Sequence, residues 1–141
     1  MAKSLSGAAR ALLESPAVAH LATIDPDGSP QVAVIWVGLD GDEIVSAHLN
    51  PEQRKLRNIR RDPRVTLSIE TDHINDHGLL EYLVIRGTAR ITEGGAADLL
   101  QRLAHTYLGP EVRFPPMDEP PPGVIVHVTI DAIGGVGDWT A

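Results

Sequence analysis

The stretch RKLRNIRRDPR, residues 54–64, holds six of the chain's twelve lysine and arginine residues and one acid, Asp62. Its net charge is +5 in a 141-residue chain of net charge −7, so the rest of the sequence carries −12. Positive charge concentrated in one segment costs self-repulsion, which a bound anion would relieve. The function therefore depends on which anion this segment binds.

The residues around the basic stretch predict that it forms a helix. Asn50 can cap the helix, Pro51 suits its first position and Gln53 completes a capping box. Asp62 precedes Pro63 and ends the helix, because a residue before proline is pushed out of the helical region.

The helix is expected to have one apolar stripe and two kinds of basic face. At about 100° per residue, Leu56 and Ile59 form the stripe, and Lys55 and Arg60 flank it. A flanking cation can bury its stem while its charged head reaches a groove, which suits a phosphate. A solvated basic face is the alternative interpretation. The polar side chains opposite the stripe are Arg54, Arg57, Asn58 and Arg61.

On both sides of this helix, the sequence predicts strands joined by hairpins. The long apolar run at 30–39 is typical of a strand covered on both faces. The order of elements favours a mostly β (α+β) fold, in which an antiparallel sheet closes into a barrel with two or three flanking helices. One domain is expected over residues 1–141. The expected strands are 18–24, 30–39, 43–48, 64–71, 79–92 and 124–133, and the other helices are 4–14 and 93–109.

Composition narrows the class of protein. The chain has no cysteine, which excludes disulfides, thiolate catalysis and zinc–thiolate sites. It is acidic and has only five aromatic residues, so we expect no nucleic-acid partner. No apolar run approaches the roughly 18 residues of a membrane span, so we expect a cytoplasmic protein without a membrane partner.

Residues 20–69, HLATIDPDGSPQVAVIWVGLDGDEIVSAHLNPEQRKLRNIRRDPRVTLSI, carry a family resemblance. The spaced features ATxxxxGxP and RKxxNxxxDPRV occur in the order found in the pyridoxamine 5′-phosphate oxidase superfamily. The chain resembles the flavin-binding split β-barrel of that superfamily, and the order of strands and helices extends the resemblance over most of its length.

The resemblance implies a cofactor site at a homodimer interface. It places the cofactor phosphate at Arg54 and Lys55, and Ser46 and Ala47 near the phosphate and ribityl chain. A longer anionic tail could meet the remaining arginines. By the same resemblance the flavin ring lies along Val34, Ile35 and Trp36, and the tail arginines are Arg57, Arg60 and Arg61.

The sequence departs from the oxidase that acts on vitamin B6. The positions that match the oxidase's second-strand Arg and Lys are Ala33 and Gly38, and no cation follows Arg113. A phosphorylated vitamin would lose its charge partners, so we expect a different substrate.

The motif RNxRRDPRV and the short chain are similar to those of the branch of this superfamily that uses the deazaflavin coenzyme F420. This coenzyme is more anionic than FMN, which fits the surplus arginine. The resemblance therefore implies an oxidoreductase that transfers a hydride between coenzyme F420 and a small organic substrate. The same fold with FMN, and a cofactor carrier without turnover, are the alternatives. No catalytic side chain is assigned, since deazaflavin chemistry requires none.

Histidines and a tryptophan elsewhere have less specific interpretations. His73 and His77 in the predicted loop DHINDHG (72–78) lack the three or four converging ligands of a zinc site, so we expect no metal. The resemblance places this loop near the substrate mouth. We interpret His48 as a structural residue, with a place facing the phosphate as the alternative, and Trp139 as packing against the partner subunit.

Overall fold

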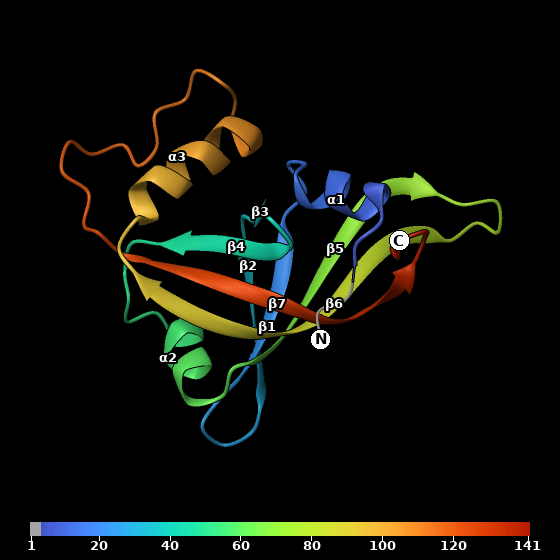
Figure 1. Cartoon of the computed structure of the whole chain (residues 1–141), viewed down its shortest axis with the longest axis horizontal. Coiled ribbons are helices and arrows are strands. Elements are labelled where there is room, and N and C mark those ends of the chain that lie inside the picture. Colours follow the sequence, from blue (N-terminus) through green and yellow to red (C-terminus); the bar gives the residue numbers. More distant parts are fainter. Residues whose placement is uncertain (1–3) are drawn as a thin grey trace.

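The computed structural model describes residues 4–141, which form one antiparallel sheet with three helices (Figure 1). The fold is mostly β, as predicted. None of the helices in residues 4–141 is long and apolar enough to cross a membrane. The elements in chain order are α1 Gly7–Leu13, β1 Ala19–Ile24, β2 Pro30–Ile35, β3 Gly38–Asp40, β4 Glu43–His48, α2 Arg54–Arg61, β5 Arg64–Ile74, β6 Leu80–Glu93, α3 Ala96–Tyr107 and β7 Val124–Val136.

The seven strands lie in the order β2-β1-β5-β6-β7-β4-β3. The sheet has two free edges, β2 and β3, so the prediction of a sheet closed by hydrogen bonds is wrong. The prediction of a split barrel is confirmed. The split falls inside the run 30–39, which was expected to be one strand. β2 pairs with β1 and β3 pairs with β4, so the chain crosses from one edge to the other at Trp36 and Val37.

A side chain from α3 binds the backbone at the split. The Val37 N–H donates to the Tyr107 hydroxyl at 3.0 Å, and this hydroxyl donates to the Ala17 carbonyl at 2.8 Å. These bonds satisfy backbone groups that have no strand partner there. The barrel is thus joined at this point by Tyr107 rather than by a ladder.

The β2 strand is covered on one face only. Val32 and Val34 are each 59% exposed, whereas Ile35 is buried. The prediction of a strand covered on both faces is therefore wrong in this chain. Apolar side chains on the outer face of an edge strand give the same continuous run as two-sided burial.

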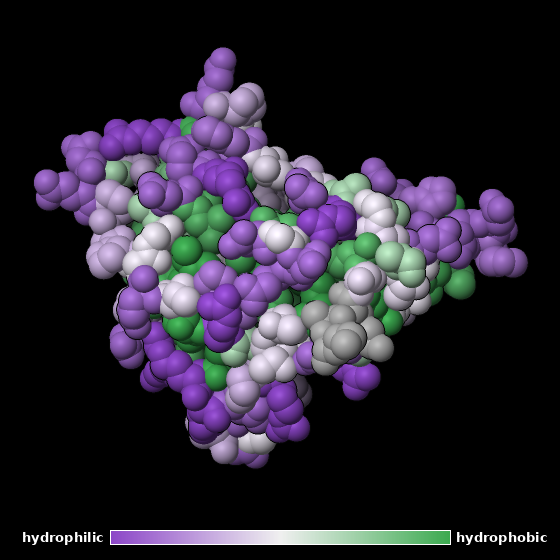
Figure 2. All heavy atoms as spheres, in the orientation of Figure 1, coloured by the Kyte–Doolittle hydropathy of each residue, from purple (hydrophilic) through white to green (hydrophobic). Residues whose placement is uncertain are grey.

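The core fills the inside of the sheet. Inward residues alternate along β1, β5 and β6, as period two requires. Trp139 is also buried there and donates to the Tyr82 carbonyl at 2.9 Å, so its predicted place on a partner surface is wrong. On the face seen in Figure 2, apolar residues also lie in recesses between α3 and the sheet, edged by hydrophilic residues.

Helix α2 ends where the sequence predicts but starts later. Asp62 is its C-cap, and Leu56 and Ile59 are buried as expected. The capping box is absent: Gln53 is the N-cap without a side-chain bond, and the Asn50 carboxamide accepts from Glu52 N–H at 2.9 Å. Asn50 thus stabilises the turn that precedes the helix.

The segment 72–78 is more regular than predicted. β5 continues to Ile74, and a tight turn at Asn75–Gly78 leads into β6, with Gly78 at φ 82°. This β5–β6 hairpin projects from the body of the molecule, at the right of Figure 1. His73 and His77 lie exposed on it. In residues 4–141, no group of three or more His, Asp or Glu is placed to hold a metal ion.

Candidate functional site

A cavity of about 270 Å³ lies between the end of β2, the end of β4, α2 and α3. Five of the ten residues that the sequence analysis assigned to the cofactor line this cavity. They come from segments up to about twenty residues apart in the chain. Those five are Val34, Ile35, Trp36, Ala47 and Lys55, and the other lining residues are Val18, His48, Leu100 and Phe114.

One wall of the cavity is aromatic and is held in place by α3. Trp36 stacks on Tyr107 with ring centroids 5.3 Å apart and an angle of 11°, and its ring lies 5.2 Å from that of Phe114. Phe114 N–H donates to the Gln101 carboxamide oxygen at 2.9 Å, and the same Gln101 donates to the Val112 carbonyl at 2.8 Å. These two bonds hold part of the proline-rich loop between α3 and β7, residues 108–123, against α3. No sequence pattern predicted that Phe114 would line the cavity.

Lys55 brings a positive charge to this apolar cavity. It is half-buried, and burial lowers the pKa of its ammonium group. Within residues 4–141, no ion pair or hydrogen bond offsets that desolvation. A cation that is partly removed from water and lacks a counter-ion favours binding of an anion.

His48 lies beside Lys55 and is buried. Its Nε2 is 2.9 Å from the Ser46 hydroxyl oxygen. Burial, and to a smaller extent the charge of Lys55, together lower the His48 pKa to about 4. Alternation along β4 puts Ser46 and His48 on one side and Ala47 on the other. Ala47 and His48, at the end of β4, both line the cavity, whereas Ser46 does not and contacts His48 instead.

Arg54 occupies a different place from Lys55. Its guanidinium makes a bidentate ion pair with Asp25, with Nε 2.9 Å from Oδ1. Asn58, expected opposite the apolar stripe, is buried and donates to the same carboxylate at 2.9 Å and to Thr23 at 3.0 Å. The Arg54 and Asn58 bonds hold the pKa of Asp25 below its usual range. The residues predicted as a phosphate pair thus have separate surroundings.

The other arginines of α2 also have protein neighbours. Arg61 donates to the Ile24 carbonyl and to the Asn58 side chain, and Arg60 donates to the Pro51 carbonyl at 2.8 Å. Arg57, Arg54 and Arg61 line a second hollow of about 370 Å³, which we call the turn hollow. Its remaining lining residues are Asp25, Pro26, Asp27 and Asn58.

Sequence reasoning missed Asp25, although a signal was present. Thr23 and Asp25 continue the inward face of β1 that Leu21 begins, and all three are buried. A polar pair on a buried face requires partners, and the adjacent basic helix supplies them.

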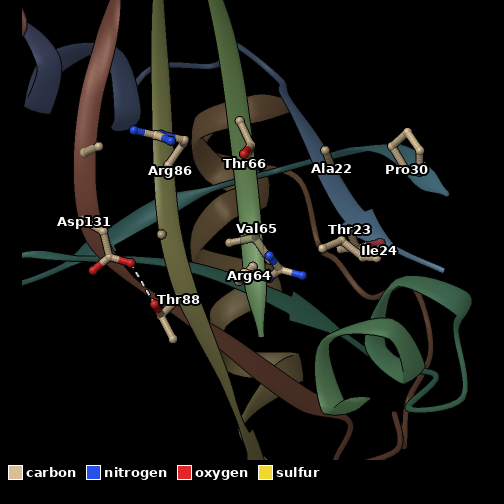
Figure 3. Close-up of a pocket in the computed structure, with 12 residues that line it drawn as sticks. Ala22, Thr23, Ile24, Pro30, Arg64, Val65, Thr66, Arg86, Thr88 and Asp131 are labelled. Carbon is tan, nitrogen blue, oxygen red and sulfur yellow. Dashed lines mark hydrogen bonds between the residues drawn. The ribbon is translucent and has the colours of Figure 1, made fainter. Parts of the chain in front are cut away.

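A larger hollow, of about 570 Å³, lies on the outer face of the sheet (Figure 3). It is lined by outward residues of β1, β5, β6 and β7, including Ala22, Thr66 and Arg86. The Thr88 hydroxyl donates to the Asp131 carboxylate at 2.7 Å at its edge. This hollow lacks the aromatic wall of the first cavity.

The family model for pyridoxamine 5′-phosphate oxidase matches residues 5–137. The chain belongs to this family. The match spans all ten elements of the fold and includes every residue of the cavity.

Solved structures of similar chains agree with this assignment. An F420 reductase is 33% identical, with 92% of this chain and 97% of that chain covered and a TM-score of 0.72. The conserved hypothetical protein Rv2991 from Mycobacterium tuberculosis is 26% identical, with 98% and 86% covered and a TM-score of 0.71. An FMN-binding protein from Syntrophomonas wolfei is 16% identical, with 92% and 84% covered and a TM-score of 0.66, and shows the fold alone. The family model and the similar F420 reductase together support an oxidoreductase family.

Proposed function

We propose that this chain is an oxidoreductase that transfers a hydride between coenzyme F420 and a small organic substrate. The observation that carries the proposal is the partly buried cation of Lys55, which is unpaired among residues 4–141, in a cavity with an aromatic wall. The similar F420 reductase supports the choice of cofactor.

The residues of the cavity fit such a cofactor. Lys55 would bind its phosphate as a point charge, while Val34, Ile35 and Trp36 would contact its ring. The deazaflavin supplies two-electron hydride transfer when bound. The protein's part is to orient the ring and exclude water, which the Trp36–Phe114 wall does without a catalytic side chain. No residue is assigned a proton-transfer role.

The surplus arginines are proposed to meet the anionic tail. Arg57 faces the turn hollow and follows Lys55 by two residues in α2. Arg61 shares that hollow but already binds the Ile24 carbonyl, so Arg57 is the better candidate. An exposed contact of this kind contributes about 0–1 kcal/mol, so the tail should affect affinity less than the phosphate does.

Titration of the purified protein tests the cofactor. We expect oxidised coenzyme F420 to bind more tightly than FMN when each is followed by fluorescence in the same buffer. We also expect the protein to accelerate oxidation of reduced coenzyme F420 by an added organic hydride acceptor. Tight FMN binding without F420 binding would make FMN the cofactor. Binding of F420 without any acceleration would favour the carrier.

A twofold homodimer with the cofactor at its interface is part of the proposal. Val34 lines the cavity and is also 59% exposed, so a partner subunit over β2 would cover the cavity and this apolar surface together. Val32 is equally exposed on β2 but does not line the cavity.

We expect Val32→Glu to convert the dimer into a monomer, because a dimer would bury the new carboxylate without a partner. Sedimentation velocity at micromolar concentration measures this change. Val32→Thr, of similar shape and uncharged, is the control and should stay dimeric. If the wild-type protein sediments as a monomer, the proposed homodimer interface is wrong.

A further inference from the structure

Two titratable residues line the cavity, His48 at the end of β4 and Lys55 in the first turn of α2. The other seven lining residues are apolar or aromatic. Any charge that enters the cavity therefore acts on these two groups with little competition, and low polarity strengthens its effect.

Few neighbouring groups affect the protonation of His48. Its Nε2 contacts the Ser46 hydroxyl, and the residue opposite it on β7 is Val124. α3 contributes Leu100 to this cavity, and α2 contributes Lys55, whose charge lowers the pKa of His48. Among the other cations of α2, Arg54 in the first turn binds Asp25, and Arg60 in the last turn binds the Pro51 carbonyl. Within the described chain, no acid stabilises a charged imidazole at this point.

We propose that His48 binds the cofactor's phosphate together with Lys55 and takes up a proton from solvent when that anion binds. The proton returns to solvent on release, so binding and protonation are one coupled equilibrium. This inference rests on the proposed function, because the anion is the phosphate of the bound cofactor.

The direction of the coupling follows from electrostatics. Without ligand, burial and the charge of Lys55 keep the imidazole neutral, and its pKa is about 4. An anion beside both groups offsets the field of Lys55 and attracts an imidazolium, so it raises the pKa of His48. By linkage, an anion that raises a pKa binds more tightly as the pH falls.

The effect is large enough to measure. If binding raises the His48 pKa from about 4 to about 6, the Kd would be about tenfold lower at pH 5 than at pH 8. Most of the change would fall between pH 6 and pH 5. Over that range the bound protein would hold about 0.5 to 0.8 proton more than the free protein.

Calorimetry at pH 5.5 with coenzyme F420 measures the proton directly. Titrations in acetate and in MES, which release different heats on losing a proton, give the number of protons taken up. Because the ligand has titratable groups of its own, the difference between wild type and His48→Gln is the decisive quantity. The glutamine can still contact Ser46 but cannot be protonated.

His127→Gln is the matched control. His127 is also partly buried with a lowered pKa and contacts the Thr92 hydroxyl at 2.8 Å, but it lies outside this cavity. We expect this variant to take up as many protons as wild type, and His48→Gln to take up several-fold fewer. Binding with equal uptake in wild type and His48→Gln overturns the inference and leaves the proposed function intact. No binding of coenzyme F420 by wild type overturns both.

Discussion

Replacement of Lys55 by methionine is expected to weaken binding of coenzyme F420 by about 1.5–3 kcal/mol, or roughly ten- to a hundredfold in Kd. The variant removes the one α2 cation that faces the cavity and keeps the apolar stem. Fluorescence titration at constant salt measures the change. The melting temperature should not fall, because the ammonium group is partly desolvated and has no partner among the described residues.

Arg60→Met and Arg54→Met are the matched controls for Lys55. Arg60 flanks the apolar stripe on its other side and binds the Pro51 carbonyl, so its loss should leave the Kd almost unchanged. Arg54→Met leaves the buried Asp25 carboxylate without its ion pair, so it should lower stability more than affinity. Equal Kd values for wild type, Lys55→Met and Arg54→Met would show that the basic segment is a solvent-exposed face that does not bind the cofactor phosphate.

The contrast between Arg54 and Lys55 shows where sequence reasoning stops. The stripe of Leu56 and Ile59 was predictable, because helical period alone places these residues on one face. The separation of Arg54 from Lys55 was not, since it depends on Asp25, which lies twenty-nine positions earlier. A cation's surroundings are set by residues that only the fold brings near.

The split of the barrel has the same kind of cause. Residues 30–39 form a continuous apolar run, and nothing within the run marks a break at Trp36 and Val37. The break is satisfied by Tyr107, seventy positions later, whose hydroxyl binds Val37. Local propensity predicts the strands, whereas tertiary contacts decide where an edge strand ends.

The cavity itself was partly predictable. The family resemblance gave Val34, Ile35, Trp36, Ala47 and Lys55, which the structure brings together. It did not give Phe114, which lies in a loop without periodic sequence. Phe114 N–H donates to Gln101, and Gln101 donates to Val112 of the same loop. Loops place side chains by specific contacts, and a single sequence does not reveal those contacts.

Leu56→Ala is expected to have the largest effect on stability. Leu56 is fully buried in the main core, one residue after Lys55, and deletion of a buried leucine side chain typically costs about 2–5 kcal/mol. The site permits little collapse, because α2 is fixed at one side by the Asp25–Arg54–Asn58 bonds. Urea unfolding at pH 7, analysed with a constant m-value, gives the change in the free energy of unfolding.

The control for Leu56→Ala is Leu79→Ala on the projecting hairpin. Leu79 is 53% exposed, so the same chemical deletion should change the free energy of unfolding by no more than about 0.5 kcal/mol. Cofactor should recover part of the loss in Leu56→Ala, because a ligand that binds only the folded state stabilises it by mass action. Equal destabilisation by the two variants would mean that α2 does not depend on its apolar stripe, and that Lys55 is held at the cavity by some other contact.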